Sequence, residues 1–159
     1  HRLNRRQRQM CIRDRYMTSV SINTANTGSG LYATATSYAA MDIEIIGLDI
    51  DGAAGDGVTL SGDTITAAIS FADIANADNL GLSSDEAELS FTDSSISASG
   101  TSGAELLSGE KLTFSNNTIT GNAEYGLICG DIDLSDCSGN AFKKNTSGDT
   151  LSCPSECSE

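Results

Sequence analysis

Three aspartates lie close together in the sequence and could serve as metal ligands. Asp49, Asp51 and Asp56 fall within eight residues, and carboxylate oxygens are the ligands that Ca²⁺ prefers. Asp49 and Asp51 have the spacing of the first two ligands of a twelve-residue calcium loop, but Ala53 stands where that loop needs a third. We therefore keep the three aspartates as calcium candidates without a loop motif, and expect no other cofactor. The alternative is a solvated acidic face.

Cysteine is the other residue type whose spacing carries chemistry. Four cysteines lie near the C-terminus: Cys129, Cys137, Cys153 and Cys157. They contain no C-x-x-C pair and the chain has one histidine, His1, so neither a zinc site nor a base-activated thiol is favoured. An even number of clustered cysteines indicates disulfides instead. Disulfides place the protein outside a reducing cytosol, so we expect it to be secreted or at the cell surface.

The charges are divided unevenly along the 159 residues. Residues 1–15 hold six arginines and one acid, whereas residues 16–159 hold three lysines and 21 acids, a sum of −18. Without arginine or histidine after residue 15, the chain can form neither a basic nucleic-acid groove nor a Ser-His-Asp hydrolase site. A second acidic patch with strand-like alternation comprises Asp131, Asp133 and Asp136.

The first fifteen residues stand apart from the rest. Residues 9–14 read QMCIRD, which resembles the translated end of a transposon-based sequencing adaptor. We interpret residues 1–15, including Cys11, as an artefact and exclude them from fold reasoning. The alternative is a basic arm that binds anionic partners. On the first interpretation, neither the true N-terminus nor a signal peptide can be judged from this sequence.

Strands joined by tight turns are the elements expected to position these residues. Short alternating apolar and polar runs are punctuated by Gly, Asn, Asp and Ser, which is typical of strands. No stretch approaches the roughly 18 apolar residues of a membrane span. The nearest helical stripe, over residues 67–80, alternates at least as well as it follows a 3.6-residue period. Residues 16–40 are expected to form an incomplete coil or a frayed segment.

One apolar pattern recurs along the chain. The pattern has two apolar residues separated by one polar residue, and a third apolar residue after four further positions. It appears as Ile43-x-Ile45…Ile50, Val58-x-Leu60…Ile65, Leu89-x-Phe91…Ile96 and Leu112-x-Phe114…Ile119. Asn117 and Asn122 recur 23 residues later as Asn140 and Asn145. The first two of these four units start 15 residues apart, and the second and third start 31 residues apart. The register between residues 50 and 89 therefore stays open. Units of about 23 residues without a helix bury their apolar faces only by stacking.

Two segments carry a resemblance to a known family. Residues 112–122 and 139–145 resemble the right-handed parallel β-helix repeats of pectate-lyase-like proteins. The resemblance implies an all-β, right-handed parallel β-helix of about four to five coils over residues 41–151, with a cysteine-containing cap over 152–159. The side chains expected to point inward are Leu89, Phe91, Ile96, Leu112, Phe114, Ile119, Ile132, Leu134 and Phe142.

The stacking implied by the resemblance bears on the disulfide pairing. Cys129 and Cys153 follow the Asn122 and Asn145 repeats by seven and eight residues, so stacked coils would bring them roughly 4.8 Å apart. The remaining two cysteines would then pair as the tail folds back. The local alternative, in which each cysteine pairs with its neighbour in sequence, closes two short loops and stays open at this point.

The family includes polysaccharide lyases and hydrolases, but their catalytic residues cannot be placed here. No arginine follows Arg15, and Lys111, Lys143 and Lys144 are the only lysines. We therefore predict an exported structural or binding β-helix that contacts carbohydrate, without catalysis by this part of the chain, without nucleic-acid binding and without a membrane span. The alternative is the non-catalytic part of a polysaccharide lyase or hydrolase whose active coils lie outside this sequence.

Overall fold

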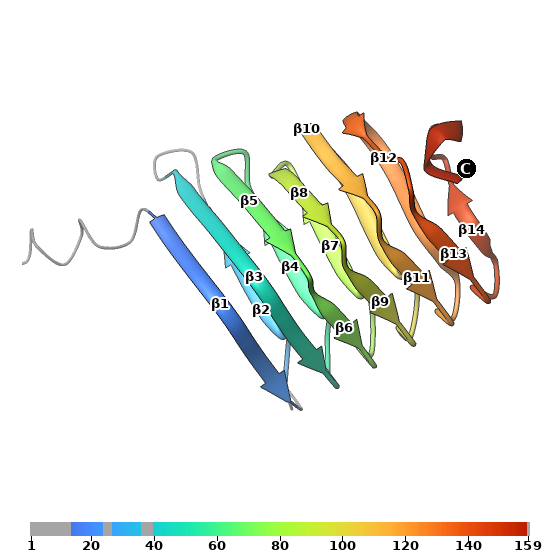
Figure 1. Ribbon diagram of the computed structural model, residues 1–159, viewed down its shortest axis with the longest axis horizontal. Helices are drawn as coiled ribbons and strands as arrows, with labels where there is room; N and C mark the ends of the chain where they lie inside the picture. Colours follow the sequence, from blue (N-terminus) through green and yellow to red (C-terminus); the bar gives the residue numbers. More distant parts are fainter. Residues whose placement is uncertain (1–13, 24–26, 36–39, 159) are drawn as a thin grey trace, which may run out of the picture.

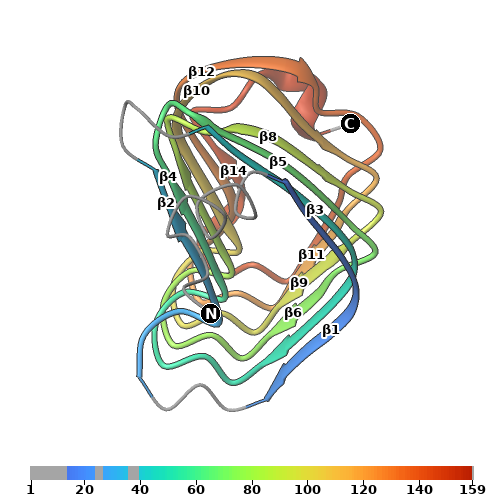
Figure 2. The same ribbon diagram turned by 90° about the vertical axis from the view of Figure 1, so that its left-hand side faces the viewer.

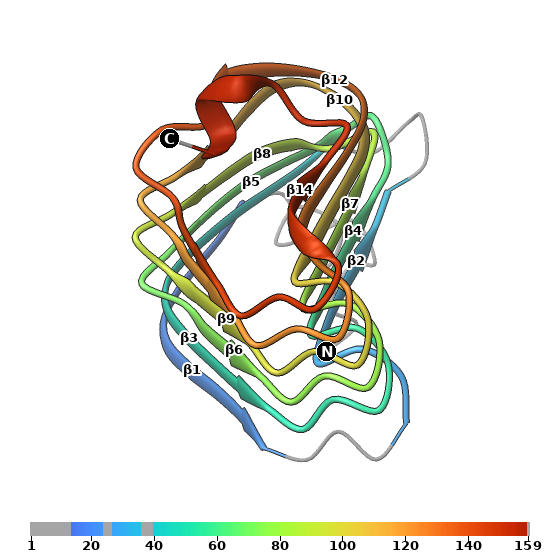
Figure 3. The ribbon, with the colours of Figure 1, turned by 90° about the vertical axis from the view of Figure 1, so that its right-hand side faces the viewer.

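The computed structural model describes residues 14–23, 27–35 and 40–158 of the chain, and these form a parallel β-solenoid of about five turns. Figures 1, 2 and 3 show the coils stacked along one axis. The strands in the described residues are β1 (Asp14–Asn23), β2 (Leu31–Thr34), β3 (Met41–Asp51), β4 (Val58–Ser61), β5 (Ile65–Ser70), β6 (Asp73–Ala75), β7 (Leu82–Asp85), β8 (Glu88–Thr92), β9 (Ser95–Ser97), β10 (Ala104–Ser115), β11 (Thr118–Thr120), β12 (Tyr125–Asp136), β13 (Ala141–Lys143) and β14 (Gly148–Leu151). A short 3-10 helix, η1 (Ser155–Ser158), ends the described chain.

The strands form three faces, and each strand pairs in parallel with its equivalent one coil further on. The first face contains β2, β4, β7, the beginnings of β10 and β12, and β14. The second contains the beginnings of β1 and β3, then β5 and β8, and the ends of β10 and β12. The third contains the ends of β1 and β3 with β6, β9, β11 and β13. This arrangement confirms the expected all-β solenoid.

The register between residues 50 and 89 differs from the pattern expected from the sequence. Ile43 pairs with Ala67, and Ala67 with Leu89, so the repeat advances by 24 and then 22 residues. The Val58-x-Leu60 pair lies on the first face and pairs with Leu31 and Ala33, so its alignment with the Ile43 unit was wrong. The error has a physical cause, because inward residues alternate on every face of a solenoid.

Stacks of apolar side chains fill the interior. Two of them are Ile45, Ile69, Phe91 and Phe114 on the second face, and Ile50, Ile74, Ile96 and Ile119 on the third, all almost completely buried. The rings of Phe91 and Phe114 stack with centroids 5.6 Å apart. Six of the nine predicted inward side chains are buried, and the remaining three, Ile132, Leu134 and Phe142, are partly buried against the core.

The corners after the second and third faces hold a ladder of asparagines in the C-terminal coils. The Asn140 side-chain oxygen accepts hydrogen bonds from the backbone N–H and side-chain amide of Asn117, at 3.0 and 3.1 Å. The Asn140 amide donates to the carbonyl of Phe114 at 2.7 Å. Asn145 makes the equivalent pair of contacts to Asn122. Buried turn groups are thereby satisfied from one coil to the next.

The described part of residues 16–40 contributes two strands to the stack. Strand β1 pairs with β3 and β2 pairs with β4. Most of the segment interpreted as an adaptor artefact, including Cys11, lies outside the described residues, whereas Asp14 and Arg15 belong to the backbone of β1. In the described segments, no helix has the length and apolarity needed to cross a membrane.

Candidate functional site

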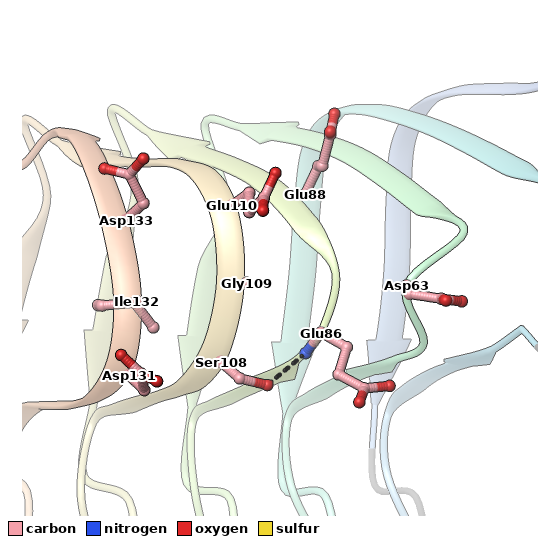
Figure 4. A pocket seen from close by; sticks show the side chains of 9 residues that line it. All are labelled: Asp63, Glu86, Glu88, Ser108, Gly109, Glu110, Asp131, Ile132 and Asp133. Atoms are coloured by element: carbon pink, nitrogen blue, oxygen red, sulfur yellow. Dashed lines mark hydrogen bonds between the residues drawn. The ribbon is translucent and has the colours of Figure 1, made fainter.

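An acidic groove of about 620 Å³ runs along the corner between the first and second faces (Figure 4). The residues that line it come from four successive coils, and most are carboxylates or polar. They are Asp63, Glu86, Glu88, Ser108, Gly109, Glu110, Asp131, Ile132 and Asp133. The groove therefore presents hydrogen-bond acceptors from several successive coils along the solenoid.

Stacking brings these carboxylates together although they are distant in sequence. Asp63 and Glu86 lie 23 residues apart, as do Glu110 and Asp133. Each pair occupies equivalent places in neighbouring coils, so the offset that links the asparagines also links the acids. Asp131 and Asp133 are the only part of this groove that was predicted from the sequence, because acids one coil apart are not neighbours along the chain.

The cationic side chain of Lys111 forms an ion pair with Glu88, one of the residues that line the groove. Its Nζ lies 2.9 Å from Oε1 of Glu88, and the lysine side chain is 73% exposed. The hydrogen bond to Glu88, with the negative charge of that carboxylate, raises the pKa of Lys111. A water-exposed ion pair of this kind adds little stability. The negative charge of Glu110, another carboxylate of the groove, also raises the pKa of Lys111.

Ser108 links two neighbouring coils at the groove through side-chain hydrogen bonds. Its hydroxyl donates to Asp85 at 2.6 Å, and its oxygen accepts the backbone N–H of Glu86 at 3.2 Å (Figure 4). Gly109 adopts a φ of +146°, and a Cβ there would approach the carbonyl of Ala87 to 2.8 Å. The corner therefore requires glycine at this position.

The calcium candidates are separate from this groove. Asp49 accepts a hydrogen bond from Ser21 at 3.3 Å, and Asp51 accepts one from Asn76 at 2.7 Å. Asp56 accepts from the Thr59 hydroxyl at 3.0 Å, which holds it in a turn. Within the described residues, no group of three or more His, Cys, Asp or Glu side chains could hold a metal ion. Calcium binding stays a prediction.

Asp136, the third member of the second acidic patch, has a local structural role. Its carboxylate accepts the backbone N–H of Ser138 at 3.0 Å and the Ser138 hydroxyl at 2.8 Å. These hydrogen bonds lower the pKa of Asp136, with the backbone N–H as the largest cause. Asp131 and Asp133 line the groove instead.

Two disulfides cross-link the C-terminal coils. Cys129 is bonded to Cys153, with Cα atoms 4.9 Å apart, and Cys137 is bonded to Cys157, with Cα atoms 4.7 Å apart. This is the pairing implied by stacked coils and not the local alternative. Cys137 and Cys157 are almost completely buried, and their bond fixes η1 against the last coils.

The fold and the groove define a parallel β-solenoid with an acidic lateral surface and a disulfide-bonded end. The sequence model of one family, described as a right handed beta helix region, matches residues 29–153. The chain therefore belongs to the right-handed β-helix family, which confirms the resemblance carried by residues 112–122 and 139–145. No curated protein and no solved structure gives a significant match.

Proposed function

We propose that this protein is an exported β-helix that acts as a rigid structural or binding element outside the cytosol and contacts carbohydrate. The observation that carries the export part is the pair of disulfides, Cys129–Cys153 and Cys137–Cys157. Such bonds persist in oxidising compartments and are rare where thiols are kept reduced. They also cross-link the last described coils of the stack.

Rigidity follows from the way in which the coils are joined. Every face is a parallel ladder, and the side chains of each coil pack on those of the next. Stability in such a stack is approximately a sum of coil and interface contributions. This construction suits an extended element that presents a fixed outer surface.

The chemistry of the groove supports contact with carbohydrate without catalysis. Carboxylates accept hydrogen bonds from sugar hydroxyls, and six of them line one groove. The chain carries no arginine or histidine after residue 15, and Lys111 is engaged by Glu88. The fold alone does not decide function, so the proposal rests on these side chains.

Three measurements test the proposal. The chain is produced in an oxidising compartment and its cysteines are mapped without reduction; all four C-terminal cysteines are expected to be oxidised. Free thiols at any two of the four, or zinc bound to the reduced chain, would overturn the export argument.

The same material is applied to a glycan array, where binding is expected, and incubated with polygalacturonate, where no cleavage is expected. Cleavage abolished by one Asp or Lys substitution would establish an enzyme instead.

A further inference from the structure

Each coil turns from the second face to the third through one residue with a positive φ. The residues at this corner are Ser19 (54°), Gly47 (77°), Phe71 (53°), Asp93 (51°), Asn116 (57°) and Gly139 (70°). Glycine, asparagine and aspartate adopt this conformation readily, whereas a bulky side chain does so at a cost. Phe71 is therefore the exception at a position where the fold favours small or polar residues.

Burial does not compensate for this conformation of Phe71. Its side chain is 63% exposed, although its neighbours Ile69 and Ile74 are fully buried in the core. The turn itself is closed by the backbone, since the N–H of Phe71 donates to the carbonyl of Thr92 at 3.3 Å. Any residue except proline could make that bond. The fold thus gives no reason for an aromatic ring at this corner.

The ring stands beside a shallow groove of about 310 Å³ that is separate from the acidic groove described above. Besides Phe71 it is lined by Ser19, Val20, Ser21, Gly47, Leu48, Asp49 and Asp73. Gly47 occupies the corner position of the adjacent coil and presents no side chain. The volume lies at the lower end of the roughly 300–1,000 Å³ typical of small-molecule sites.

Three polar side chains form a row along this groove. Ser21, Asp49 and Asp73 occupy the same place in successive coils of the third face, paired in register. The hydroxyl of Ser21 donates to Asp49 at 3.3 Å, and Asp73 accepts the hydroxyl of Ser95 at 2.5 Å. Both carboxylates are exposed and retain lone pairs for further donors.

An aromatic face beside two carboxylates matches the chemistry of a sugar. The face of an aromatic ring is electron-rich and packs on weakly positive C–H groups, and the ring hydroxyls of a sugar donate to carboxylates in charge-assisted hydrogen bonds. No basic side chain lines the groove in the described structure, so an anionic ligand such as a uronate is disfavoured. Pyranose rings with equatorial substituents, as in β-1,4-linked glucose, present the flattest C–H face.

We propose that Phe71, with Asp49 and Asp73, binds one pyranose ring of a neutral β-1,4-linked glycan. This inference rests on the proposed contact with carbohydrate and adds to it a second site, separate from the acidic groove, with its own ligand class. Asp49 then has a role in sugar binding and not in a calcium site. The repeated geometry of the coils positions the aromatic ring and the carboxylates, and the exceptional residue at one corner creates the binding platform.

The test measures binding of cellohexaose by calorimetry and by amide chemical shifts. Wild-type protein is expected to bind, with shift changes at residues 71, 49 and 73, and Phe71→Ala is expected to weaken binding at least tenfold, whereas Phe71→Trp retains it. Tyr32→Ala is the matched control, because Tyr32 is 64% exposed but lies on β2, on another face. This variant is expected to bind as the wild type does. Thermal unfolding of Phe71→Asn checks that loss of the ring leaves the fold intact.

The outcomes separate this site from the general proposal. If glycans bind on the array but Phe71→Ala has the affinity of wild-type protein, the Phe71 site is overturned while contact with carbohydrate stands. Binding of hexagalacturonate alone, without cellohexaose, overturns the neutral ligand class. If the array shows no binding to wild-type protein, the carbohydrate part of the proposed function fails, and the Phe71 site fails with it.

Discussion

At the corner between the second and third faces, the N-terminal coils bury apolar side chains and the C-terminal coils bury asparagines. At the position that follows the positive-φ residue, the earlier coils bury Leu48 and Ala72, whereas the later coils bury Asn117 and Asn140. Ser94 stands between them, and its backbone N–H already donates to Asn117 at 3.1 Å. The ladder therefore changes from apolar to amide within three coils.

The second corner shows the same change. Ala53 and Ala77 give way to Ser99 and then to Asn122 and Asn145. The backbone N–H of Ser99 donates to Asn122 at 3.0 Å, but the Ser99 hydroxyl, which is buried, finds no partner. Serine is too short to continue the amide ladder here. The comparison shows that one backbone path accepts either apolar packing or a satisfied polar ladder, and that the incomplete step lies where the two meet.

The supporting interactions follow the same division. In the last coils Ile132, Leu134 and Phe142 are only partly buried, and the asparagines and both disulfides lie there. The middle coils are held by fully buried apolar stacks, whereas Met17, Val20 and Ile22 of the first described coil are also only partly buried. We infer that the C-terminal half adds polar ladders and covalent bonds to an apolar core that becomes thinner toward its last coil.

The largest effect is expected where both halves share the core. Phe114 is fully buried and stacks on Phe91, so Phe114→Ala should lower the free energy of unfolding by about 3–5 kcal/mol. Urea unfolding measures the change. A loss below about 1 kcal/mol would mean that Phe114 and Phe91 are not packed as described. The two halves could then not be compared as parts of one shared core.

Removing a disulfide should weaken the C-terminal half selectively. The chain-entropy cost of loops with sequence separations of 24 and 20 residues predicts a loss of about 3 kcal/mol for either bond. Paired Cys→Ser variants are compared by hydrogen exchange, with faster exchange expected in β12 and β14 and unchanged exchange in β3 and β5. Uniformly faster exchange would contradict the division into two halves.

Truncating one asparagine tests the polar ladder directly. Asn117→Ala leaves the N–H of Ser94 and the carbonyl of Phe91 without their partners, and an unsatisfied buried group costs about 1–3 kcal/mol. Thr118→Ala, at an exposed neighbouring position, is the control and should change stability by less than about 0.5 kcal/mol. Equal effects of the two substitutions would show that the ladder is not a source of stability.

The smallest effect is expected to have the opposite sign. Phe71→Asn places a tolerant residue at a positive-φ corner and should raise the free energy of unfolding by about 0.5 kcal/mol. Thermal denaturation at several urea concentrations resolves a change of this size. A loss of more than about 1 kcal/mol would show that the ring stabilises the fold and would remove the argument that it is present for binding.

The sequence predicted the core better than the surface, for a physical reason. Inward positions such as Phe91 and Ile119 are constrained to be apolar, and Asn117 and Asn140 must match to hydrogen-bond, so both signals recur at 23 residues. The Ala67 coil was missed because alanine gives a weak apolar signal in a slot that Ile43 and Leu89 fill in the adjacent coils.

The grooves could not be predicted in the same way. Outward positions tolerate many residue types, so the carboxylates of Asp63 and Glu86 form no visible repeat until the register is known. Phe71 could have been found as a bulky residue at the corner aligned with Asn116, but only after the coil containing Ala67 had been recognised. The residues of either groove can therefore be identified only after the coils have been aligned in the correct register.

The stacking register is the claim on which the corners, the grooves and the Phe71 site all depend. Nuclear Overhauser effects between backbone protons of isotopically labelled protein test it most directly. We expect cross-strand effects from Ala67–Ile69 to both Ile43–Ile45 and Leu89–Phe91. Effects that join Val58–Leu60 to Leu89–Phe91, with none from Ala67–Ile69 to either neighbour, would contradict this register.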